Sequence, residues 1–225
     1  MEHTESIDWQ MARSNVYGLL GSLLSIPPTD EAIRQLSRPR AAESIKGLFD
    51  DPPLVEKMDH LAERYRSGNL STEVVAVDFE GLMRVPGAYY THPYESNYSG
   101  RNQNGARRKW NSVLGRQARE VERRYREEGL EPRYDRIDFA DHIGAELTFM
   151  AHICRKTAEA MLAQRYDESE RLLTKQRQFA KTHLLPWAGD FSEELAKKAE
   201  TPFFHAVAAL LSAFLRLEQE EPTVH

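Results

Sequence analysis

Four titratable side chains lie within about two helical turns of one another in the segment 138–150, DFADHIGAELTFM. They are Asp138, Asp141, His142 and Glu146. On a helix, His142 and Glu146 share a face because they are four residues apart. Such a group could bind a cationic ligand, hold a metal ion or carry acid–base chemistry. It could equally be structural, with Asp138 capping the helix, Asp141 favouring its dipole and His142 as a buried, hydrogen-bonded side chain.

The metal and catalytic alternatives have little further support in the sequence. A metal site needs more ligands, for which His152 and His183 are available, but the paired Glu-x-x-His repeats of di-metal helical bundles are absent. Catalysis lacks a recognisable partner, because the chain has no Walker-type glycine loop, dinucleotide glycine fingerprint, His-Glu-x-x-His or Gly-x-Ser-x-Gly. We therefore expect no catalytic residue, no metal and no cofactor. Ligand binding and the structural role both stay open.

A second unusual stretch, residues 79–98, FEGLMRVPGAYYTHPYESNY, combines aromatic residues with prolines. Apolar residues at helical spacing run as far as Met83, and Pro86 with Gly87 is a helix stop. Tyrosines then crowd into ten residues, at positions 89, 90, 94 and 98. Tyrosine joins a large apolar face to a hydrogen-bonding tip. The loop is therefore either fixed on a helical core or used for recognition, and spacing alone does not decide between the two.

The rest of the chain is predicted to be helical, without a convincing strand or hairpin. The first helix is predicted from Trp9 to Leu24, with Trp9, Ala12, Val16 and Leu19 inward. Thr29 is expected to cap a short second helix, and a weaker helical segment follows over 39–49. Asp51 and Pro52 start a helix that runs through Tyr65 and is expected to stop at Gly68, and Ser71 or Thr72 caps the helix that leads into the aromatic loop. A long helix is predicted over about 104–128, with Trp110, Val113 and Leu114 on one face. The remaining helices are predicted over 138–164, from a capping box at 167–170 to Pro186, and after Thr201. Trp187 and Phe191 are expected to pack a short connection. The predicted fold is a single globular all-α bundle of about 8–11 helices.

The segment 130–137, LEPRYDRI, is short, polar and contains a proline. It is the best candidate for a hinge between helical subdomains 1–129 and 138–225. Exchange of subdomains through such a hinge would give a domain-swapped dimer, and a monomer is the alternative.

Composition and charge limit which classes of partner and which cellular compartment we expect for the protein. The 225 residues carry a formal net charge of −5, which does not favour nucleic acid or an anionic membrane. Arginines crowd the segment 107–126, but acids interleave with them, so we expect an ion-paired surface. The lone cysteine, Cys154, fits a reducing compartment. Without a signal-peptide pattern or an apolar run of about 20 residues, we expect a cytoplasmic protein with no stable membrane insertion.

The two unusual stretches resemble sequence patterns of the TorD/DmsD/NarJ family of redox-enzyme maturation chaperones. Residues 79–98 are similar to aromatic-x-x-Leu-aromatic-x-Gly-Pro followed by Pro-Tyr-Glu-Ser-x-Tyr, and residues 138–150 to Glu-Pro-x-Asp-His…Glu-Leu-x-Phe-Met. The segments 17–20, 179–187 and 201–204 resemble the opening and closing segments of the family. The chain departs from the patterns at Val85, where Gly is usual, at Met83, where an aromatic residue is common, and at 138–140.

The resemblance implies an all-α, non-enzymatic chaperone. It would bind the twin-arginine (Tat) leader of the catalytic subunit of a molybdenum-cofactor oxidoreductase and assist cofactor insertion, folding and proofreading before export. Leader binding would fall on Phe79, Leu82, Met83, Pro86, Pro93, Tyr94, Ser96 and Tyr98, and on Asp141 and His142. Guanine-nucleotide binding, associated with some members, is not expected because the sequence has no phosphate loop.

The chemistry of such a leader suggests which part of the leader each of these residues would bind. Two guanidinium groups beside an apolar stretch need carboxylates next to an apolar groove. We expect Asp141, with Glu95 or Glu146, to pair the arginines, while the aromatic and aliphatic side chains take the apolar part. An alternative is an all-α scaffold or regulator that binds partner helices without preferring paired arginines. A metal-dependent helical enzyme is a third alternative.

Overall fold

The structure is a computed structural model that describes residues 6–38, 43, 47, 49–98, 115–133, 135 and 137–220. In these residues every regular element is a helix, apart from one isolated β-bridge between Tyr94 and His142. The predicted all-α fold is confirmed. The chain forms two compact units, each assembled from two separate stretches. Unit 1 is Met1–Ser25 with Pro93–Ala188, and unit 2 is Ile26–His92 with Gly189–His225.

The boundaries of the units differ from the subdomains suggested by the sequence. The chain passes between units at residues 25/26, 92/93 and 188/189, and the segment 130–137 lies inside unit 1. The hinge is thus not one of these boundaries, and it stays a prediction.

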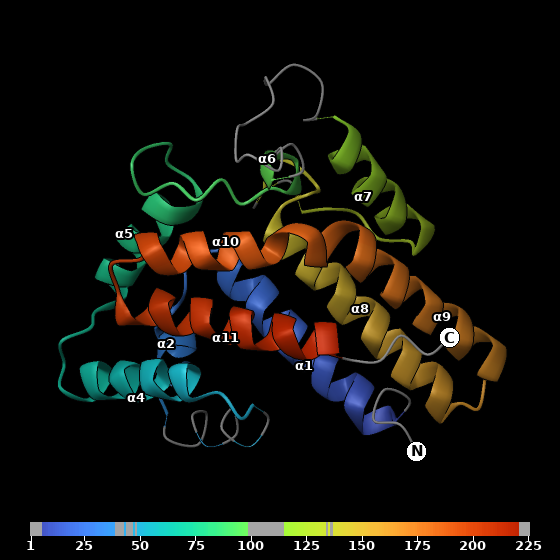
Figure 1. Cartoon of the computed structure of the whole chain (residues 1–225), viewed down its shortest axis with the longest axis horizontal. Coiled ribbons are helices and arrows are strands. Elements are labelled where there is room, and N and C mark those ends of the chain that lie inside the picture. Colours follow the sequence, from blue (N-terminus) through green and yellow to red (C-terminus); the bar gives the residue numbers. More distant parts are fainter. Residues whose placement is uncertain are drawn as a thin grey trace. The chain divides into compact units, whose positions relative to one another are not determined.

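Unit 1 is built around the long helix α8. Its elements are α1 (Ile7–Ser25), α6 (Glu95–Tyr98), α7 (Arg116–Glu127), α8 (Ile143–Leu162), α9 (Tyr166–Phe179), the π-helical turn η2 (Ala180–Leu184) and the first residues of α10 (Leu185–Lys198). Both α1 and α9 pack along α8 (Figure 1). At the crossing of α1 and α8, a Cβ on Gly144 would lie 2.0 Å from Ser25 Oγ and 3.0 Å from the Gly21 carbonyl oxygen. The two helices can approach this closely because glycine has no side chain.

The buried face of α1 is more polar than its apolar spacing predicts. Leu19, expected inside, is 41% exposed, whereas Arg13 and Ser14 are buried. Arg13 Nη1 donates to Gln176 Oε1 of α9 at 2.6 Å. Ser14 Oγ donates to the carbonyl oxygen of Ala151 in α8 at 2.8 Å. Because these buried polar groups have partners, their burial does not carry the cost of an unsatisfied group.

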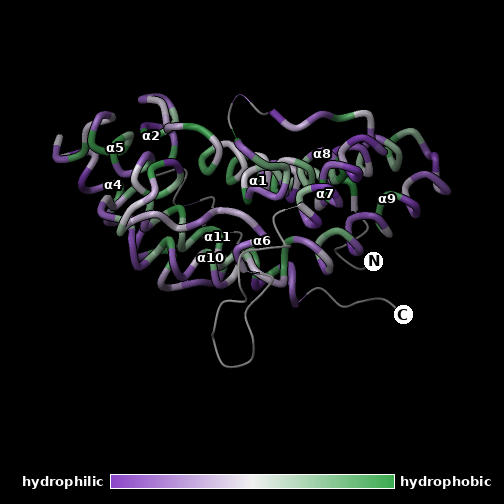
Figure 2. Tube along the Cα trace, turned by 90° about the horizontal axis from the view of Figure 1, so that it is seen from above, coloured by the Kyte–Doolittle hydropathy of each residue, from purple (hydrophilic) through white to green (hydrophobic). Residues whose placement is uncertain are grey.

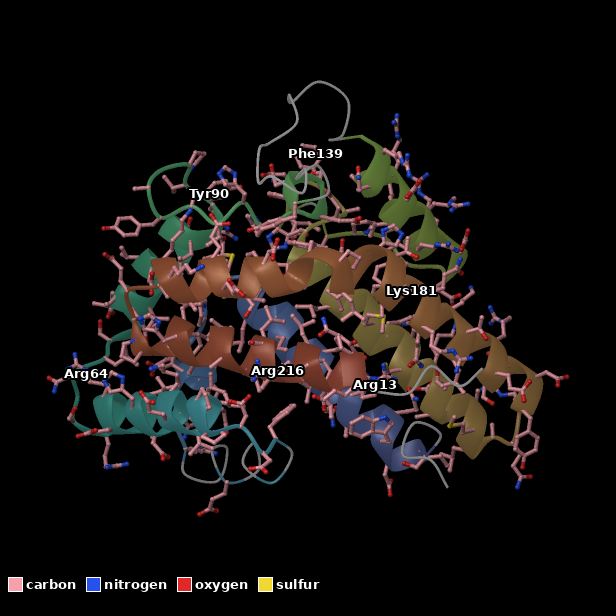
Figure 3. All side chains as sticks on the ribbon, viewed as in Figure 1. Arg13, Arg64, Tyr90, Phe139, Lys181 and Arg216 are labelled. Atoms are coloured by element: carbon pink, nitrogen blue, oxygen red, sulfur yellow. The ribbon has the colours of Figure 1, made fainter. Side chains whose placement is uncertain are left out.

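Unit 2 places helix α11 at its centre. Its elements are α2 (Asp30–Leu36), α4 (Pro52–Arg66), α5 (Thr72–Met83), the remainder of α10 and α11 (Pro202–Glu220). Helix α11 packs on α4 and α5 (Figure 1), and Ser192 Oγ of α10 donates to the carbonyl oxygen of Ala208 in α11 at 3.0 Å. Arg216, labelled in Figure 3, extends from α11 and pairs with Asp51 at the start of α4.

The helix starts of unit 2 follow the predicted caps. The side chains of Thr29, Asp51 and Ser71 each accept a hydrogen bond from the backbone N–H three residues further on. Thr201 Oγ1 accepts from Phe204 N in the same way at the start of α11. At the other end of α4, Gly68 has a φ of +70°, as expected for a glycine stop.

The predictions for α9 and α10 are wrong in two respects. The capping box at 167–170 does not form, because α9 begins at Tyr166 and Arg165 makes no side-chain cap. The helix also does not stop at Pro186, since η2 and α10 continue it and place Trp187 and Phe191 on a helix. Proline lacks an N–H and crowds the carbonyl four residues earlier. The wider π-helical turn just before it relaxes the regular hydrogen-bond pattern at that point.

Helix α7 carries the expected ion-paired surface. Within it, Arg116 pairs with Glu120 and Arg126 with Glu122, and the tube in Figure 2 is hydrophilic along most of the helix. The predicted helix over 104–114 lies outside the described residues, as does most of 39–49. Within the described ranges, no helix combines the length and the apolar character that a membrane crossing requires.

Candidate functional site

Helix α8 begins at Ile143, five residues after the predicted start. His142 is its N-cap, and its Nδ1 accepts a hydrogen bond from Gly144 N at 3.0 Å. Asp138 is exposed and does not cap the helix. The backbone explains the difference, because Ile143 N donates to the Pro93 carbonyl at 2.9 Å and Glu95 N donates to the Asp141 carbonyl at 2.9 Å. These pairings with another segment hold His142 in an extended conformation, after a turn in which His142 N donates to the Phe139 carbonyl, so the helix starts only at Ile143.

The end of the first motif, residues 93–98, therefore meets the second motif in unit 1. Beyond the backbone pairing, Ser96 N donates to Asp141 Oδ2 at 3.0 Å, and Tyr94 OH donates to Asp138 Oδ2 at 3.2 Å. The short helix α6 thus begins on the Asp141 carboxylate, where the N–H groups of a helix start favour a negative charge. Of the predicted site residues, the structure brings together Pro93, Tyr94, Glu95, Ser96, Tyr98, Asp141, His142 and Glu146.

Three carboxyl groups are buried at this junction. Glu95, Asp141 and Glu146 are 6%, 0% and 0% exposed. Glu95 Oε2 lies 3.0 Å from His183 Nδ1, and Glu146 Oε2 accepts from Trp187 Nε1 at 3.0 Å. Two oxygens, Asp141 Oδ1 and Glu146 Oε1, have no hydrogen-bond partner among the described residues. We refer to Glu95, Asp141 and Glu146 as the carboxyl cluster.

Burial changes the acidity of the carboxyl cluster. It raises the pKa of Glu146 well above the ordinary value of 4.5, and the neighbouring carboxyl groups of Glu95 and Asp141 raise it further. Burial also raises the pKa of Asp141, although the N–H of Ser96 opposes the shift. Both directions follow from the cost of holding several negative charges away from water. The cluster therefore favours a bound proton, or another positive charge in its place.

The tyrosines of the aromatic loop divide into buried and exposed members. Tyr98 stacks on Trp187 with ring centroids 5.2 Å apart, and Tyr94 packs between His142 and Phe139. Both tyrosines are 7% exposed, so they fix the loop on the core of unit 1. Tyr89, in contrast, is exposed. Figure 3 labels Phe139, which is itself partly exposed.

The remaining predicted site residues belong to unit 2, and most of them are core residues there. Phe79, Leu82 and Met83 are buried, and Phe79 packs against Phe204 with ring centroids 6.2 Å apart. Pro86 is exposed. The Leu82 carbonyl accepts from both the N–H and the hydroxyl of Thr91, which holds the residues after α5 against the helix.

Sequence reasoning missed two residues that contact the carboxyl cluster. The sequence indicates His183 only as a possible metal ligand and predicts that Trp187 packs a short connection. Their spacing of four residues could have indicated a shared helix face, had Pro186 not been interpreted as a stop. Among the described residues, no group of three or more His, Cys, Asp and Glu side chains could hold a metal ion.

Comparison with known proteins gives consistent matches over most of the chain. The model of a family described as nitrate reductase delta subunit matches residues 50–193. The chaperone protein TorD of Aeromonas salmonicida is 28% identical over 211 residues, covering 92% of this chain and 89% of the relative. The proteins of the same name from Colwellia psychrerythraea and Escherichia coli are each 24% identical, covering 93% and 91% of this chain and 91% and 94% of the relatives.

Proposed function

The chain belongs to the nitrate reductase delta subunit family, and from this premise we propose that it is a cytoplasmic chaperone for the maturation of a molybdenum-cofactor oxidoreductase. Relatives that match nearly the whole chain are named chaperone protein TorD, which supports a binding role over a catalytic one. Its client would be the catalytic subunit of the oxidoreductase. The chaperone would bind the twin-arginine leader of that subunit until the cofactor is inserted.

The carboxyl cluster is the observation that carries the leader-binding part of this proposal. A guanidinium group is recognised by carboxylate oxygens that can accept its hydrogen bonds. Asp141 Oδ1 and Glu146 Oε1 have that capacity unused among the described residues. The raised pKa values of Asp141 and Glu146 indicate that a positive charge would relieve the repulsion within the cluster.

Access to the carboxyl cluster requires movement of the segment that covers it. Residues 93–98 are held over Asp141 by the hydrogen bonds from Glu95 N and Ser96 N. We propose that the leader displaces part of this segment. When the leader dissociates, the contacts of Pro93, Tyr94, Tyr98 and His142 bring the segment back over Asp141.

The apolar residues of unit 2 have a supporting role in this proposal. Phe79, Leu82 and Met83 have little surface to offer a ligand, because they are buried. They stabilise the C-terminal end of α5, and the aromatic loop follows directly after it. Pro86 stays a candidate contact because its side chain is exposed.

Calorimetric titration with a synthetic twin-arginine leader tests the proposal, with Lys-Lys and Ala-Ala versions of the peptide as comparisons. Asp141→Asn should weaken binding about tenfold to a hundredfold, the range expected for one hydrogen bond to a charged group. Asp167→Asn is the matched control, since Asp167 is an exposed acid in the first turn of α9, outside the cluster and outside residues 93–98. Unchanged affinity of a folded Asp141→Asn variant would contradict the role of Asp141. Absence of binding to several leaders would favour the scaffold alternative.

A further inference from the structure

A cavity of about 350 Å³ opens on unit 1 beside the segment 130–137. Helices α1 and α8 both line it with small residues, among them Gly18 and Gly21 of α1 and Gly144 of α8. Leu130 and Ile137 contribute apolar surface from the connecting segment, and Ala145 contributes it from α8. The volume lies within the range of about 300–1,000 Å³ that is typical of ligand pockets.

Three of the hydroxyl groups that line the cavity can only accept hydrogen bonds from a ligand. Ser25 Oγ donates its proton to a carbonyl of α1 at 2.7 Å, and Thr148 Oγ1 donates to a carbonyl of α8 at 2.7 Å. Tyr125 OH likewise donates to the Ala145 carbonyl. A hydroxyl has one proton to donate but two lone pairs, so these three groups present oxygen lone pairs.

The charged and titratable groups of the cavity favour the same kind of ligand. Glu131 is exposed at the rim, and within the described residues it makes no ion pair or hydrogen bond. The rim cation Arg133 is already paired, because its Nε and Nη2 donate to the two carboxylate oxygens of Asp135 at 2.9 Å each. Burial lowers the pKa of His152, as does the nearby Lys156, so the imidazole is neutral at pH 7. Its Nε2 is buried and has no partner among the described residues.

We propose that this cavity binds a positively charged side chain together with apolar residues next to it, as found in an arginine-containing peptide. The cation donates to the hydroxyl oxygens and pairs with Glu131, while its apolar neighbours pack on Leu130, Ile137 and Ala145. This inference rests on the proposed function, because a twin-arginine leader supplies both kinds of group. It assigns the leader a contact separate from the carboxyl cluster.

The dimensions of the cavity suit a short extended segment. Gly144 and His152 both line it. They are eight residues apart on α8, which corresponds to about 12 Å along the helix axis. An extended peptide rises about 3.4 Å per residue, so roughly four of its residues span this distance. An arginine and the first apolar residues after it would therefore fit along α8.

A substitution at the mouth of the cavity tests the inference directly. Ser22 lines the cavity and is exposed, so Ser22→Trp should fill the opening without disturbing the core. Thr174→Trp is the matched control, because Thr174 is an exposed hydroxyl residue of α9 that does not line the cavity. In calorimetric titrations of the full chain with a synthetic twin-arginine leader, Ser22→Trp should lower affinity about tenfold or more, the effect of losing one buried apolar contact. Thr174→Trp should leave it unchanged.

Two substitutions of Glu by Gln test whether Glu131 pairs with the cation of the peptide. This test does not require a large side chain to be introduced. Glu131→Gln should weaken leader binding about two- to fivefold, as expected for one exposed ion pair, and the loss should shrink at high salt. Glu170→Gln, an exposed acid of α9 away from the cavity, is its control. Replacing the apolar residues of the peptide by serine should reduce the effect of Ser22→Trp, because the two changes remove the same contact.

The outcomes separate this inference from the proposed function. If Ser22→Trp and Glu131→Gln are folded by circular dichroism and bind the leader like the parent, the cavity inference is wrong, whereas a loss of binding in Asp141→Asn still supports the chaperone proposal. If Ser22→Trp fails to fold, the comparison of Glu131→Gln with Glu170→Gln decides. If the parent chain binds no leader, the proposed function itself fails.

Discussion

Replacing Gly144 by alanine should force α1 and α8 apart where they cross. The new Cβ would lie 2.0 Å from Ser25 Oγ, 3.2 Å from Ser25 Cβ and 3.0 Å from the carbonyl oxygen of Gly21. The Ser25 hydroxyl can rotate away, but the carbonyl belongs to the backbone of α1. Relief of that contact therefore requires a shift of one helix against the other, and tightly packed interiors resist such shifts.

Two opposing terms set the size of the effect. Inserting one carbon into a packed interface costs about 1–3 kcal/mol. Alanine favours a helix over glycine by up to about 1 kcal/mol, and less in the first turn where Gly144 lies. We expect a net loss of about 1–2 kcal/mol in the free energy of unfolding. For a protein of about this size, that loss corresponds to a fall in Tm of roughly 2–8 °C.

Thermal unfolding followed by circular dichroism provides the assay. Adding Ser25→Ala to Gly144→Ala should recover part of the lost Tm, because it removes the nearest of the clashing atoms. Gly189→Ala is the matched control, since nothing lies within 4 Å of a Cβ there and the residue is on a helix. It should stabilise the chain slightly. A Gly144→Ala variant that melts at or above the parent temperature would refute the close helix crossing.

Two further predictions concern buried carboxyl groups. Asp78→Asn should lower the free energy of unfolding by about 2–3 kcal/mol in urea denaturation, because the carboxylate accepts from Thr201 N at 2.8 Å, Thr201 Oγ1 at 2.6 Å and Glu200 N; an unchanged denaturation midpoint would contradict these bonds. Glu146→Gln should make the free energy of unfolding depend less on pH. The pKa of Glu146 is raised in the folded state, so Glu146 contributes its full stabilisation below the ordinary pKa of 4.5 and loses it as the pH rises towards the folded-state pKa. Denaturation midpoints at several pH values between 4.5 and 8 check this, and a parent-minus-variant difference that does not change over that interval would exclude it.

Features governed by neighbouring residues could be predicted from the sequence. The caps at Thr29, Asp51 and Ser71 depend only on the next three residues, and the glycine stop at Gly68 only on its own backbone. The helical fold class followed from apolar spacing, which is also a local property. The family resemblance implies that residues of both motifs bind one leader, which stays a prediction, and the Tyr94–His142 bridge joins the end of the first motif to the second.

Features that depend on distant partners could not be predicted. The buried face of α1 contains Arg13 because Gln176 lies opposite, 163 residues along the chain. Helix α8 begins late because Ile143 N donates to the Pro93 carbonyl and the Asp141 carbonyl accepts from Glu95 N. Trp187 was not assigned to the carboxyl cluster because a proline normally ends a helix, and nothing local to Pro186 shows that a π-helical turn accommodates it.

The interleaved make-up of the two units has a consequence for synthesis of the protein on the ribosome. Helix α1 emerges first, yet its partners in unit 1 come much later, and the bond from Ser14 to Ala151 spans 137 residues. At about 5–20 residues per second, α1 waits roughly 7–27 s before α8 exists. Neither unit can close until its second stretch has emerged, so folding takes place after most of the chain has been translated. A nascent chain of this protein therefore exposes apolar helix faces for that interval.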